Sequence, residues 1–434
     1  MSSADFGSLT LQLSLLLVTA HVLGYLFARL RQPRVIGEIL AGVLLGPSIL
    51  GTFAPHLSAV VFPPTDAPTS PHQVVLSFLY SLGLLLLMFV SGTEMRGLFH
   101  RDDRRQVAWL ASMGTVVPFA VALLAAPLLP LERLIGPAQQ RTALVLVIGI
   151  AVAVTSIPVI SRILHDLGIL GTRFARLVLG VAVLEDVALW AVLAIATTLA
   201  ASGDVRVTEI VQHVAITVAF LGFGLFLAPR LLRIAGAARW NVIGANSPVA
   251  YAVVVLLVFA ALGDALDVSL VFAAFLAGFA LSADGPRMSE ALESVKKFSF
   301  AVFVPIYFAV VGYQLDLSRN FSLSMLVVFL AAACALKLFA AGTGARLAGF
   351  GWRSSVNLAV ATNARGGPGI VLASVAFDAQ IINAPFFTTL VLSAVLTSQA
   401  AGFWLEYVLR RRWPLLDEDA AKVSGTTADQ RLAA

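Results

Sequence analysis

Apolar segments of about 20 residues recur along the whole chain, and this feature limits the possible folds more than any other. A helix needs about 20 mostly apolar residues to cross the hydrocarbon core of a membrane. Only 12% of the residues are charged, about half the share typical of soluble domains. We therefore predict an all-α membrane protein with 13 transmembrane helices, at residues 8–28, 35–51, 73–95, 107–129, 142–164, 174–200, 208–230, 247–262, 266–283, 298–315, 320–345, 353–376 and 384–409.

Lysine and arginine residues are distributed unevenly between these segments. Twenty-three follow odd-numbered segments or lie in the C-terminal tail, whereas four follow even-numbered segments. Because cytoplasmic loops carry the excess of basic residues, we expect the N-terminus outside and the C-terminus in the cytoplasm, in a multi-pass protein of the cell (inner) membrane. The net charge of +5 does not indicate nucleic acid binding, since no basic patch has interleaved aromatic residues.

The segments define one membrane domain and little else. Residues 1–412 form this domain, 52–72 are a proline-rich external loop, and 413–434 are expected to be a short disordered cytoplasmic tail. No cleavable signal peptide is expected, because the first 28 residues contain no Lys or Arg. The single cysteine, Cys334, excludes a disulfide within the chain, and no zinc or redox motif is present.

Two segments at matching places are interrupted. Segments 1–6 and 8–13 are predicted to be inverted repeats joined by segment 7, and the fifth member of each contains helix-breaking residues. These are Thr155-Ser156-Ile157-Pro158 and Thr362-Asn363-Ala364-Arg365-Gly366-Gly367-Pro368-Gly369. Proline and glycine in mid-helix favour unwinding, and unwound backbone at this depth persists only where it is buried or lines a wet cavity. Pro158 alone is also compatible with a simple kink.

Two adjacent acids lie near the centre of the sixth segment. Neighbouring helical residues point about 100° apart, so Glu185 and Asp186 face different neighbours. A desolvated carboxylate can hold either a proton or a cation. Competition between the two for one site is the chemistry of antiport. The alternative is a purely structural ion pair with the basic residues of the predicted segments.

Lys337 and Arg365 are the two basic residues that lie well inside predicted segments, away from the segment ends. A base at this depth costs roughly 2.5–3.5 kcal/mol on insertion scales, so each needs a partner. Lys337 is expected to pair with a buried carboxylate, either as a permanent salt bridge or as a participant in proton exchange. Arg365 keeps its proton. It is expected to satisfy the carbonyl ends of the broken helices or to pair with a buried acid such as Glu94.

Several stretches in this order resemble a known family over about residues 10–410. They are Gln32-Pro33-Arg34-Val35-Ile36-Gly37-Glu38-Ile39-Leu40-Ala41-Gly42, Leu45-Gly46-Pro47, Met88-Phe89-Val90-Ser91-Gly92-Thr93-Glu94, Thr155-Ser156-Ile157-Pro158-Val159-Ile160, Val304-Pro305-Ile306-Tyr307-Phe308 and Asn363-Ala364-Arg365-Gly366. The chain resembles the cation:proton antiporter-2 family, which includes the NapA-like sodium/proton exchangers and the Kef-type potassium efflux proteins.

The resemblance implies a homodimer with two kinds of domain. Segments 1–3 and 8–10 would form the dimerisation domain, segments 4–6 and 11–13 the ion-carrying core, and segment 7 the linker. The fifth and twelfth segments would cross as discontinuous helices beside the acidic pair. The core would move against the scaffold in elevator-like alternating access.

The resemblance also implies roles for single residues. Asp186 resembles the ion-carrying aspartate and Lys337 the lysine that pairs with the preceding residue, here Glu185. Thr155, Ser156 and Asn363 lie where the crossing would add oxygen ligands, which hard cations prefer. The transported cation would be Na+ or K+, exchanged for H+.

The chain departs from the family pattern in two ways. Electrogenic relatives carry Asp–Asp at the acidic pair, and electroneutral ones often carry Asn–Asp without the lysine. Glu185–Asp186 with Lys337 retained therefore favours electrogenic exchange. Kef-type proteins also append a nucleotide-binding domain. No Gly-rich phosphate loop follows a strand in this sequence, so no such regulatory domain is expected in this chain.

Other functions stay open at this point. Arg365 and the helix N-termini beside the breaks could face an anion, as in an organic-anion symporter or an ion channel on the same fold. A membrane sensor or scaffold that transports nothing is a third possibility. An enzyme is not expected, because the six histidines show no nucleophile–base spacing, and no cofactor is expected.

Overall fold

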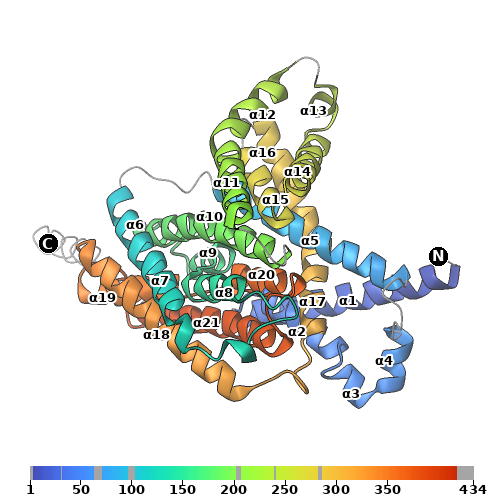
Figure 1. Ribbon diagram of the computed structural model, residues 1–434, viewed down its shortest axis with the longest axis horizontal. Coiled ribbons are helices and arrows are strands. Elements are labelled where there is room, and N and C mark those ends of the chain that lie inside the picture. Colours follow the sequence, from blue (N-terminus) through green and yellow to red (C-terminus); the bar gives the residue numbers. More distant parts are fainter. Residues whose placement is uncertain are drawn as a thin grey trace, which may run out of the picture. The chain divides into compact units, whose positions relative to one another are not determined.

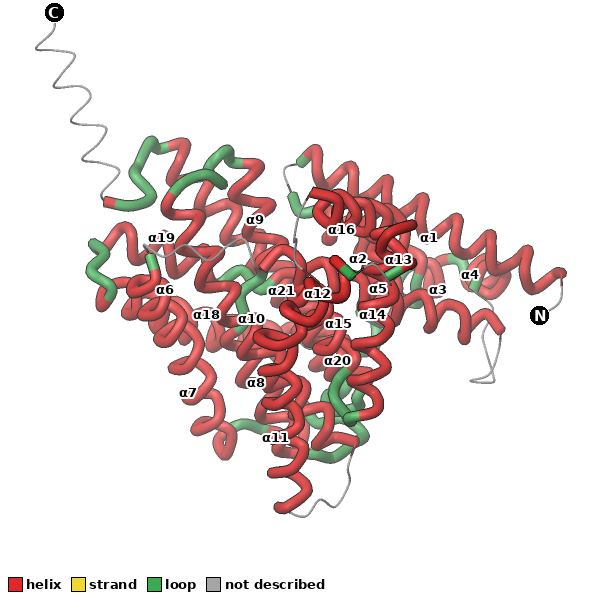
Figure 2. The backbone as a smooth tube through the Cα atoms, turned by 90° about the horizontal axis from the view of Figure 1, so that it is seen from above, coloured by secondary structure: helices red, strands yellow, loops and turns green. Residues whose placement is uncertain are grey.

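The described part of the chain is helical. The computed structural model describes residues 3–30, 32–62, 71–95, 103–201, 207–238, 241–281 and 286–417. Figure 2 shows these residues as helices joined by loops. Their β structure consists of one isolated antiparallel bridge, between Ile135 and Ile382. The prediction of an all-α protein is confirmed.

The chain divides into two compact units, each assembled from two distant stretches of sequence. Unit 1 comprises residues 1–97 and 197–321, and unit 2 comprises residues 98–196 and 322–434. The helices of unit 1 are α1 (Ser3–Arg29), α2 (Arg34–Leu45), α3 (Leu50–Phe53), α4 (Pro55–Val61), α5 (Pro71–Met95), α11 (Val207–Gly222), η5 (Phe223–Leu227), α12 (Ala228–Ala237), α13 (Val242–Asn246), α14 (Pro248–Ala265), α15 (Leu270–Leu281), α16 (Pro286–Phe298), η6 (Ser299–Phe303) and α17 (Val304–Gln314).

Unit 2 contains the remaining helices, the longer of which Figure 1 labels. They are α6 (Arg104–Ala111), η2 (Ser112–Val116), α7 (Val117–Ala125), η3 (Ala126–Leu128), η4 (Leu131–Arg133), α8 (Arg141–Ala153), α9 (Ile157–Asp166), α10 (Arg173–Ala201), α18 (Leu323–Leu347), α19 (Trp352–Thr362), α20 (Gly366–Asp378) and α21 (Ala384–Arg410). Residues 197–201 of α10 are assigned to unit 1.

Ten helical stretches of the described chain are long and apolar enough to cross a membrane. Three shorter apolar helices, Arg141–Ala153, Leu270–Leu281 and Gly366–Asp378, bring further apolar surface. Each of these thirteen stretches overlaps one predicted segment, although Arg287–Gln314 begins well before its segment, 298–315. Two of the short ones, α8 and α20, are halves of the interrupted segments. The membrane character is therefore confirmed, and the exact number of crossings stays a prediction.

The structure adds helices where loops are predicted. Residues 286–297 form most of α16, whose Ala291, Leu292 and Val295 are buried while Glu293 and Lys297 are exposed. This amphipathic pattern escapes a search for apolar segments, because its charged face lowers the mean hydropathy. The predicted external loop at 52–72 contains α4, and its residues 63–70 lie outside the described residues.

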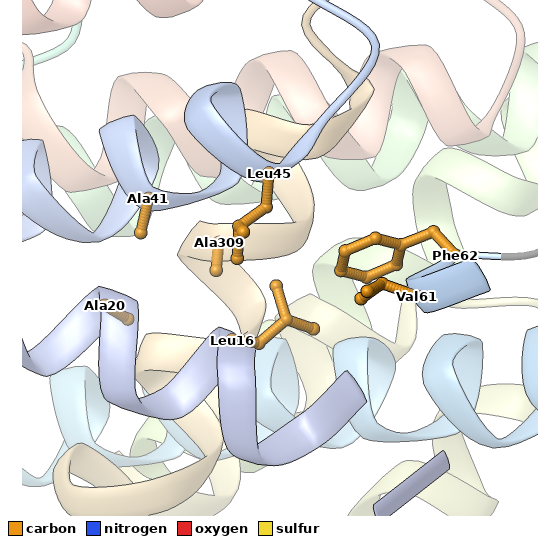
Figure 3. Packing of buried hydrophobic residues seen from close by; sticks show 7 residues of the cluster. All are labelled: Leu16, Ala20, Ala41, Leu45, Val61, Phe62 and Ala309. Atoms are coloured by element: carbon orange, nitrogen blue, oxygen red, sulfur yellow. The ribbon is translucent and has the colours of Figure 1, made fainter. Parts of the chain in front are cut away.

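The helix α4 closes a small apolar cluster of unit 1. Val61 and Phe62 at its end are each 7% exposed. They pack beside residues of α1, α2 and α17, as Figure 3 shows. The cluster consists of Leu16, Ala20, Ala41, Leu45, Val61, Phe62 and Ala309. This packing holds the first part of the predicted loop against the helices.

The start of the predicted tail packs against unit 2. Leu415 and Leu416 are buried. The Asn357 side-chain amide donates to the Leu415 carbonyl at 3.1 Å, and the Asp417 amide donates to the Ser354 hydroxyl at 2.8 Å. Residues 413–417 are thereby bound to α19 rather than disordered. The rest of the predicted tail, 418–434, lies outside the described residues.

Glycines bring two helices of unit 1 into backbone contact. A Cβ atom on Gly42 of α2 would lie 1.8 Å from the Ala309 carbonyl oxygen of α17. In return, a Cβ on Gly312 of α17 would lie 1.9 Å from the Ile39 carbonyl oxygen of α2. Neither position can accept a side chain without separating the helices. Small residues at such crossings are a general way to pack helices in membranes.

A second pair of helices repeats this arrangement. Gly92 of α5 and Gly278 of α15 approach the Phe275 and Phe89 carbonyl oxygens, which a Cβ would meet at 2.1 and 1.9 Å. The predicted repeat relates segment 2 to segment 9 and segment 3 to segment 10. These segments correspond to α2, α15, α5 and α17 in that order. The repeat therefore relates the pair of α2 and α17 to the pair of α15 and α5. An inverted repeat predicts that the same reciprocal glycine contact occurs in both pairs.

The glycine contacts lead to a matched prediction. Gly312→Ala should lower the free energy of unfolding by roughly 1–3 kcal/mol, as overpacking does. Gly222→Ala should leave it within about 0.5 kcal/mol, because a Cβ there meets nothing within 4 Å. Helix propensity favours alanine at both positions. Thermal denaturation of the purified proteins checks this, and equal midpoints for the two variants would contradict the close contact.

Candidate functional site

The two interrupted helices of unit 2 meet at their breaks. The Ser156 amide, between α8 and α9, donates to the Ala364 carbonyl oxygen, between α19 and α20, at 2.6 Å. The Thr155 hydroxyl donates to the Thr362 carbonyl oxygen at 2.5 Å. Each break thus supplies hydrogen-bond partners to the other. This exchange explains how unwound backbone persists in an apolar interior. Both discontinuous helices predicted from the sequence are present.

Gly366 is required where α20 begins. Its φ is +40°, a conformation that residues with a Cβ rarely adopt. A Cβ there would also lie 2.5 Å from Val159 Cγ2 and 2.7 Å from Ser156 Oγ. The glycine therefore lets the start of α20 approach the start of α9. This close approach maintains the contact between the two breaks.

Arg365 precedes α20 and is 2% exposed. Its Nε donates to the Ala151 carbonyl oxygen at 2.9 Å, and its Nη2 donates to the Val152 carbonyl oxygen at 3.4 Å. The guanidinium thus caps carbonyl groups at the end of α8, where a positive charge is favourable. Glu94, the other partner considered for it, instead pairs with Lys296 at 2.6 Å within unit 1.

An ion pair inside unit 2 joins α10 to α18. Lys337 Nζ lies 2.8 Å from Glu185 Oε1, and both side chains are fully buried. The ammonium also donates to the carbonyl oxygens of Gly114, at 2.9 Å, and Ala153. A lysine ammonium has three N–H donors, so all three are used. Lys337 therefore holds together α10, the turn η2 and the end of α8.

Asp186, the next residue of α10, differs from Glu185 in its contacts. It is 2% exposed, and its Oδ1 has no hydrogen-bond partner among the described residues. Glu185 Oε2 and Asn363 Oδ1 are likewise buried and unpartnered within that part of the chain. A buried oxygen in this state is unfavourable unless a donor or a cation satisfies it. A proton or a hard cation could supply what these three oxygens lack.

The other predicted oxygen ligands have structural partners. Ser156 Oγ accepts a hydrogen bond from the Val159 amide at 3.3 Å and so caps the start of α9. The Thr155 hydroxyl proton is used in the contact between the breaks, although its oxygen can still accept. The Asn363 amide donates from Nδ2 to Cys334 Sγ at 3.3 Å. Of these three residues, Asn363 is the one with a side-chain oxygen that has no hydrogen-bond partner within the described chain.

The site contains residues that the sequence analysis does not identify. The Thr115 hydroxyl donates to Glu185 Oε1 at 2.8 Å. The Thr397 hydroxyl accepts from the Arg365 amide at 3.3 Å. Single threonines in apolar helices are common, and nothing in their sequence spacing relates Thr115 or Thr397 to the charged residues. Their roles follow from tertiary packing.

Comparison with known proteins places the chain among ion exchangers. Its residues 16–411 match a family model described as sodium/hydrogen exchanger, transmembrane. Cation/H(+) antiporter 18 of Arabidopsis thaliana is 29% identical over 89% of this chain and 47% of its own length. The chain spans about half the length of this and similar curated relatives. The Na(+)/H(+)-K(+) antiporter GerN of Bacillus cereus is 26% identical over 91% of this chain and 95% of its own length.

A solved structure shows the same fold. The sodium proton antiporter MjNhaP1 from Methanocaldococcus jannaschii aligns over 91% of this chain and 95% of its own, with a TM-score of 0.51 and 14% sequence identity. This similarity concerns the fold alone, whereas the family match covers most of the sequence. The chain belongs to the family of transmembrane sodium/hydrogen exchangers.

Proposed function

We propose that this protein exchanges a monovalent cation, Na+ or K+, for protons across the cell membrane. The observation that carries the proposal is a buried acidic pair in which one carboxylate is ion-paired and the other has an unpartnered oxygen. Relatives such as GerN and the K(+)/H(+) antiporter 1 of Saccharomyces cerevisiae are cation/proton antiporters by name. The proposed exchange is the reaction that this arrangement of charges can perform.

Asp186 is the proposed carrier of both ions. When protonated, its carboxyl group is neutral and fits the apolar interior. When ionised, it is neutralised by a bound cation. Glu185 Oε2 and Asn363 Oδ1 are the proposed additional ligands, because a hard cation prefers several oxygens. Since a proton and a cation compete for one carboxylate, each drives the release of the other.

Lys337 determines how many charges move in each cycle. If its ion pair with Glu185 stays closed, one proton is exchanged for one cation. If the ion pair opens when the cation binds, Lys337 can release a second proton, and the exchange carries net charge. We favour this electrogenic cycle, because a buried lysine gives up its proton readily once it loses its counter-ion.

Unit 2 is the proposed moving part. The contacts of Glu185, Lys337, Arg365 and the two breaks are all made within unit 2. A rigid displacement of this unit would carry the ion without breaking those contacts. We propose that it moves against unit 1 as an elevator, that unit 1 provides the contact in a homodimer, and that the N-terminus lies outside.

The anion-transport alternative loses its main support. Nε and Nη2 of Arg365 donate to carbonyl groups of α8, so its charge is already engaged. Lys337, the other buried base among the described residues, uses all of its donors. Neither group is available to bind an organic anion in this arrangement.

Flux measurements in proteoliposomes test the proposal. Vesicles containing the purified protein and an internal pH dye are exposed in turn to Na+, K+ and Li+, with choline as the control cation. We expect proton movement on addition of at least one of the three alkali cations, and none on addition of choline. Absence of any cation-dependent flux between about pH 6 and 9, with correctly folded protein, would reject the antiporter assignment.

A further inference from the structure

We propose that Cys334 is a positioning residue that orients the side-chain carbonyl oxygen of Asn363 toward the transported cation. This inference rests on the proposed function, in which the unpartnered Asn363 Oδ1 is a ligand of that cation. Cys334 lies on α18 and is partly buried. Asn363 lies at the break between α19 and α20. The contact between them therefore joins an uninterrupted helix to one of the two interrupted ones.

The sulfur of Cys334 accepts two hydrogen bonds from this break. Asn363 donates to it from Nδ2 at 3.3 Å, and Arg365 donates to it from Nη1 at 3.6 Å. A cysteine sulfur is a weak acceptor, but one of these donors belongs to a charged guanidinium, which strengthens the interaction. The sulfur thus holds the amide nitrogen of Asn363 in one place.

The side-chain amide of Asn363 has a donor end and an acceptor end. Because the group is planar, fixing its nitrogen at the sulfur also fixes the direction of its oxygen. That oxygen is buried without a hydrogen-bond partner among the described residues, and the residue is 6% exposed. A half-turn of the amide would bring the nitrogen, which cannot bind a cation, to the place of the oxygen. It would also set the oxygen against the sulfur, which is at best a weak donor.

Other contacts hold the backbone and the guanidinium of the break. The Asn363 backbone amide donates to the Val360 carbonyl oxygen at 3.2 Å. Arg365 donates to the Ala151 carbonyl oxygen at 2.9 Å and to the Val152 carbonyl oxygen at 3.4 Å. The side-chain torsions of Asn363 are therefore the main remaining freedom at this place, and the sulfur restricts them.

Removing the sulfur would set the guanidinium and the cation in competition for one oxygen. Arg365 Nη1 and Asn363 Nδ2 would both lose their acceptor, and a buried donor without a partner is unfavourable. Both donors lie within 3.6 Å of the same atom. The carbonyl oxygen of Asn363 could then rotate toward Nη1 as a replacement acceptor. That rotation would withdraw Oδ1 from the cation.

The face of α18 that carries Cys334 also contacts the acidic pair. Cys334 and Lys337 are three residues apart, so they lie on the same side of the helix. Lys337 Nζ lies 2.8 Å from Glu185 Oε1. One face of α18 therefore holds both the ion-paired acid of α10 and the side chain of Asn363.

The test measures the cation concentration that gives half-maximal flux, together with the maximal flux, in proteoliposomes. Cys334→Ala removes the acceptor. We expect the half-saturating concentration to rise roughly three- to tenfold, the factor that one hydrogen bond typically carries. The maximal flux should change by less than about twofold, because a binding contact is lost. Cys334→Ser keeps an acceptor oxygen and should follow the wild type.

Thr343→Ala is the matched control on the same helix. The Thr343 hydroxyl donates to the Phe339 carbonyl oxygen at 2.8 Å, one turn earlier on α18. Its removal takes away one hydrogen-bonding group of α18 without affecting the break. Both the half-saturating concentration and the maximal flux should equal those of the wild type.

A double variant tests whether Cys334 acts through Asn363. Asn363→Ala should itself weaken cation binding. Adding Cys334→Ala to it should change the half-saturating concentration no further, because the side chain that the sulfur orients is already absent. The rise in thermal midpoint that the cation causes gives the same comparison without turnover. It replaces the flux measurement if Asn363→Ala exchanges too slowly.

The outcomes separate this inference from the proposed function. If the wild type exchanges the cation and Cys334→Ala has the wild-type half-saturating concentration, the role of Cys334 is refuted. An equal rise in Cys334→Ser would also overturn it, as would additive effects of Cys334→Ala and Asn363→Ala. Absence of cation-dependent flux in the wild type would instead reject the proposed function itself.

Discussion

Replacing Asp186 by asparagine is expected to reduce cation-dependent proton flux to the level of empty vesicles. Asparagine has nearly the same shape, but its amide neither ionises nor takes up a proton at physiological pH. It therefore cannot neutralise a cation or alternate between two ions. The flux assay with Na+, K+ and Li+ measures this loss. Glu293→Gln is a suitable control, since Glu293 is an exposed acid of α16.

The same substitution should leave the fold intact. Asp186 Oδ1 has no hydrogen-bond partner among the described residues, so no protein contact at this oxygen is lost. Replacing a buried ionisable group by a neutral one also removes a desolvation penalty. The thermal midpoint should consequently equal or exceed that of the wild type. Exchange at the wild-type rate by a folded Asp186→Asn protein would show that another group carries the ion.

Lys337→Ala is expected to have the largest effect on stability. It leaves Glu185 without its counter-ion, and it leaves the Gly114 and Ala153 carbonyl groups without a donor. Breaking a buried ion pair by removing one partner typically destabilises a protein by about 3–5 kcal/mol. Thermal or denaturant unfolding of the purified protein in detergent measures the change.

A second substitution separates the charge from the volume of the lysine. Adding Glu185→Gln to Lys337→Ala removes the unpaired carboxylate, while the Thr115 hydroxyl can still donate to the glutamine carbonyl oxygen. The double variant should therefore be more stable than Lys337→Ala alone. A single variant as stable as the wild type, with an unchanged pH profile of flux, would argue against the ion pair.

Much of the helical architecture is predictable because lipid imposes a simple pattern. A helix in hydrocarbon must satisfy its own backbone and present about 20 apolar residues, and Leu323–Leu347 and Ala384–Arg410 show that pattern directly. The breaks are predictable because residues that disfavour a helix stand out in such a pattern. Proline and clustered glycines, as at Gly366–Gly369, interrupt an otherwise apolar run.

The same criterion misses helices that are short or amphipathic. The helix α16 carries charged residues on its exposed face, and α4 has only seven residues in a proline-rich stretch. Their helical state depends on packing against other helices rather than on local composition. The segment 413–417 is ordered by its contacts with α19, which nothing in its own sequence indicates.

The residues of the candidate site also differ in whether the sequence predicts them. Glu185, Asp186 and Lys337 stand out because charge is rare in apolar segments, so the amino-acid sequence alone predicts their involvement. The hydrogen bond from Thr115 cannot be predicted in this way. It depends on the π-helical turn η2, which has no residue signature, and on the approach of two helices separated by 70 residues in sequence. Arg365 has two possible partners in the sequence, and only the tertiary structure identifies the carbonyl groups of α8.

Proton release on cation binding tests most directly whether Asp186 holds both ions in turn. Purified protein in a weakly buffered detergent solution is titrated with NaCl or KCl, with choline chloride to match ionic strength, and the pH is followed. We expect the wild type to release protons on addition of the transported cation and Asp186→Asn to release none. Equal release by both proteins would contradict a single site shared by the cation and the proton.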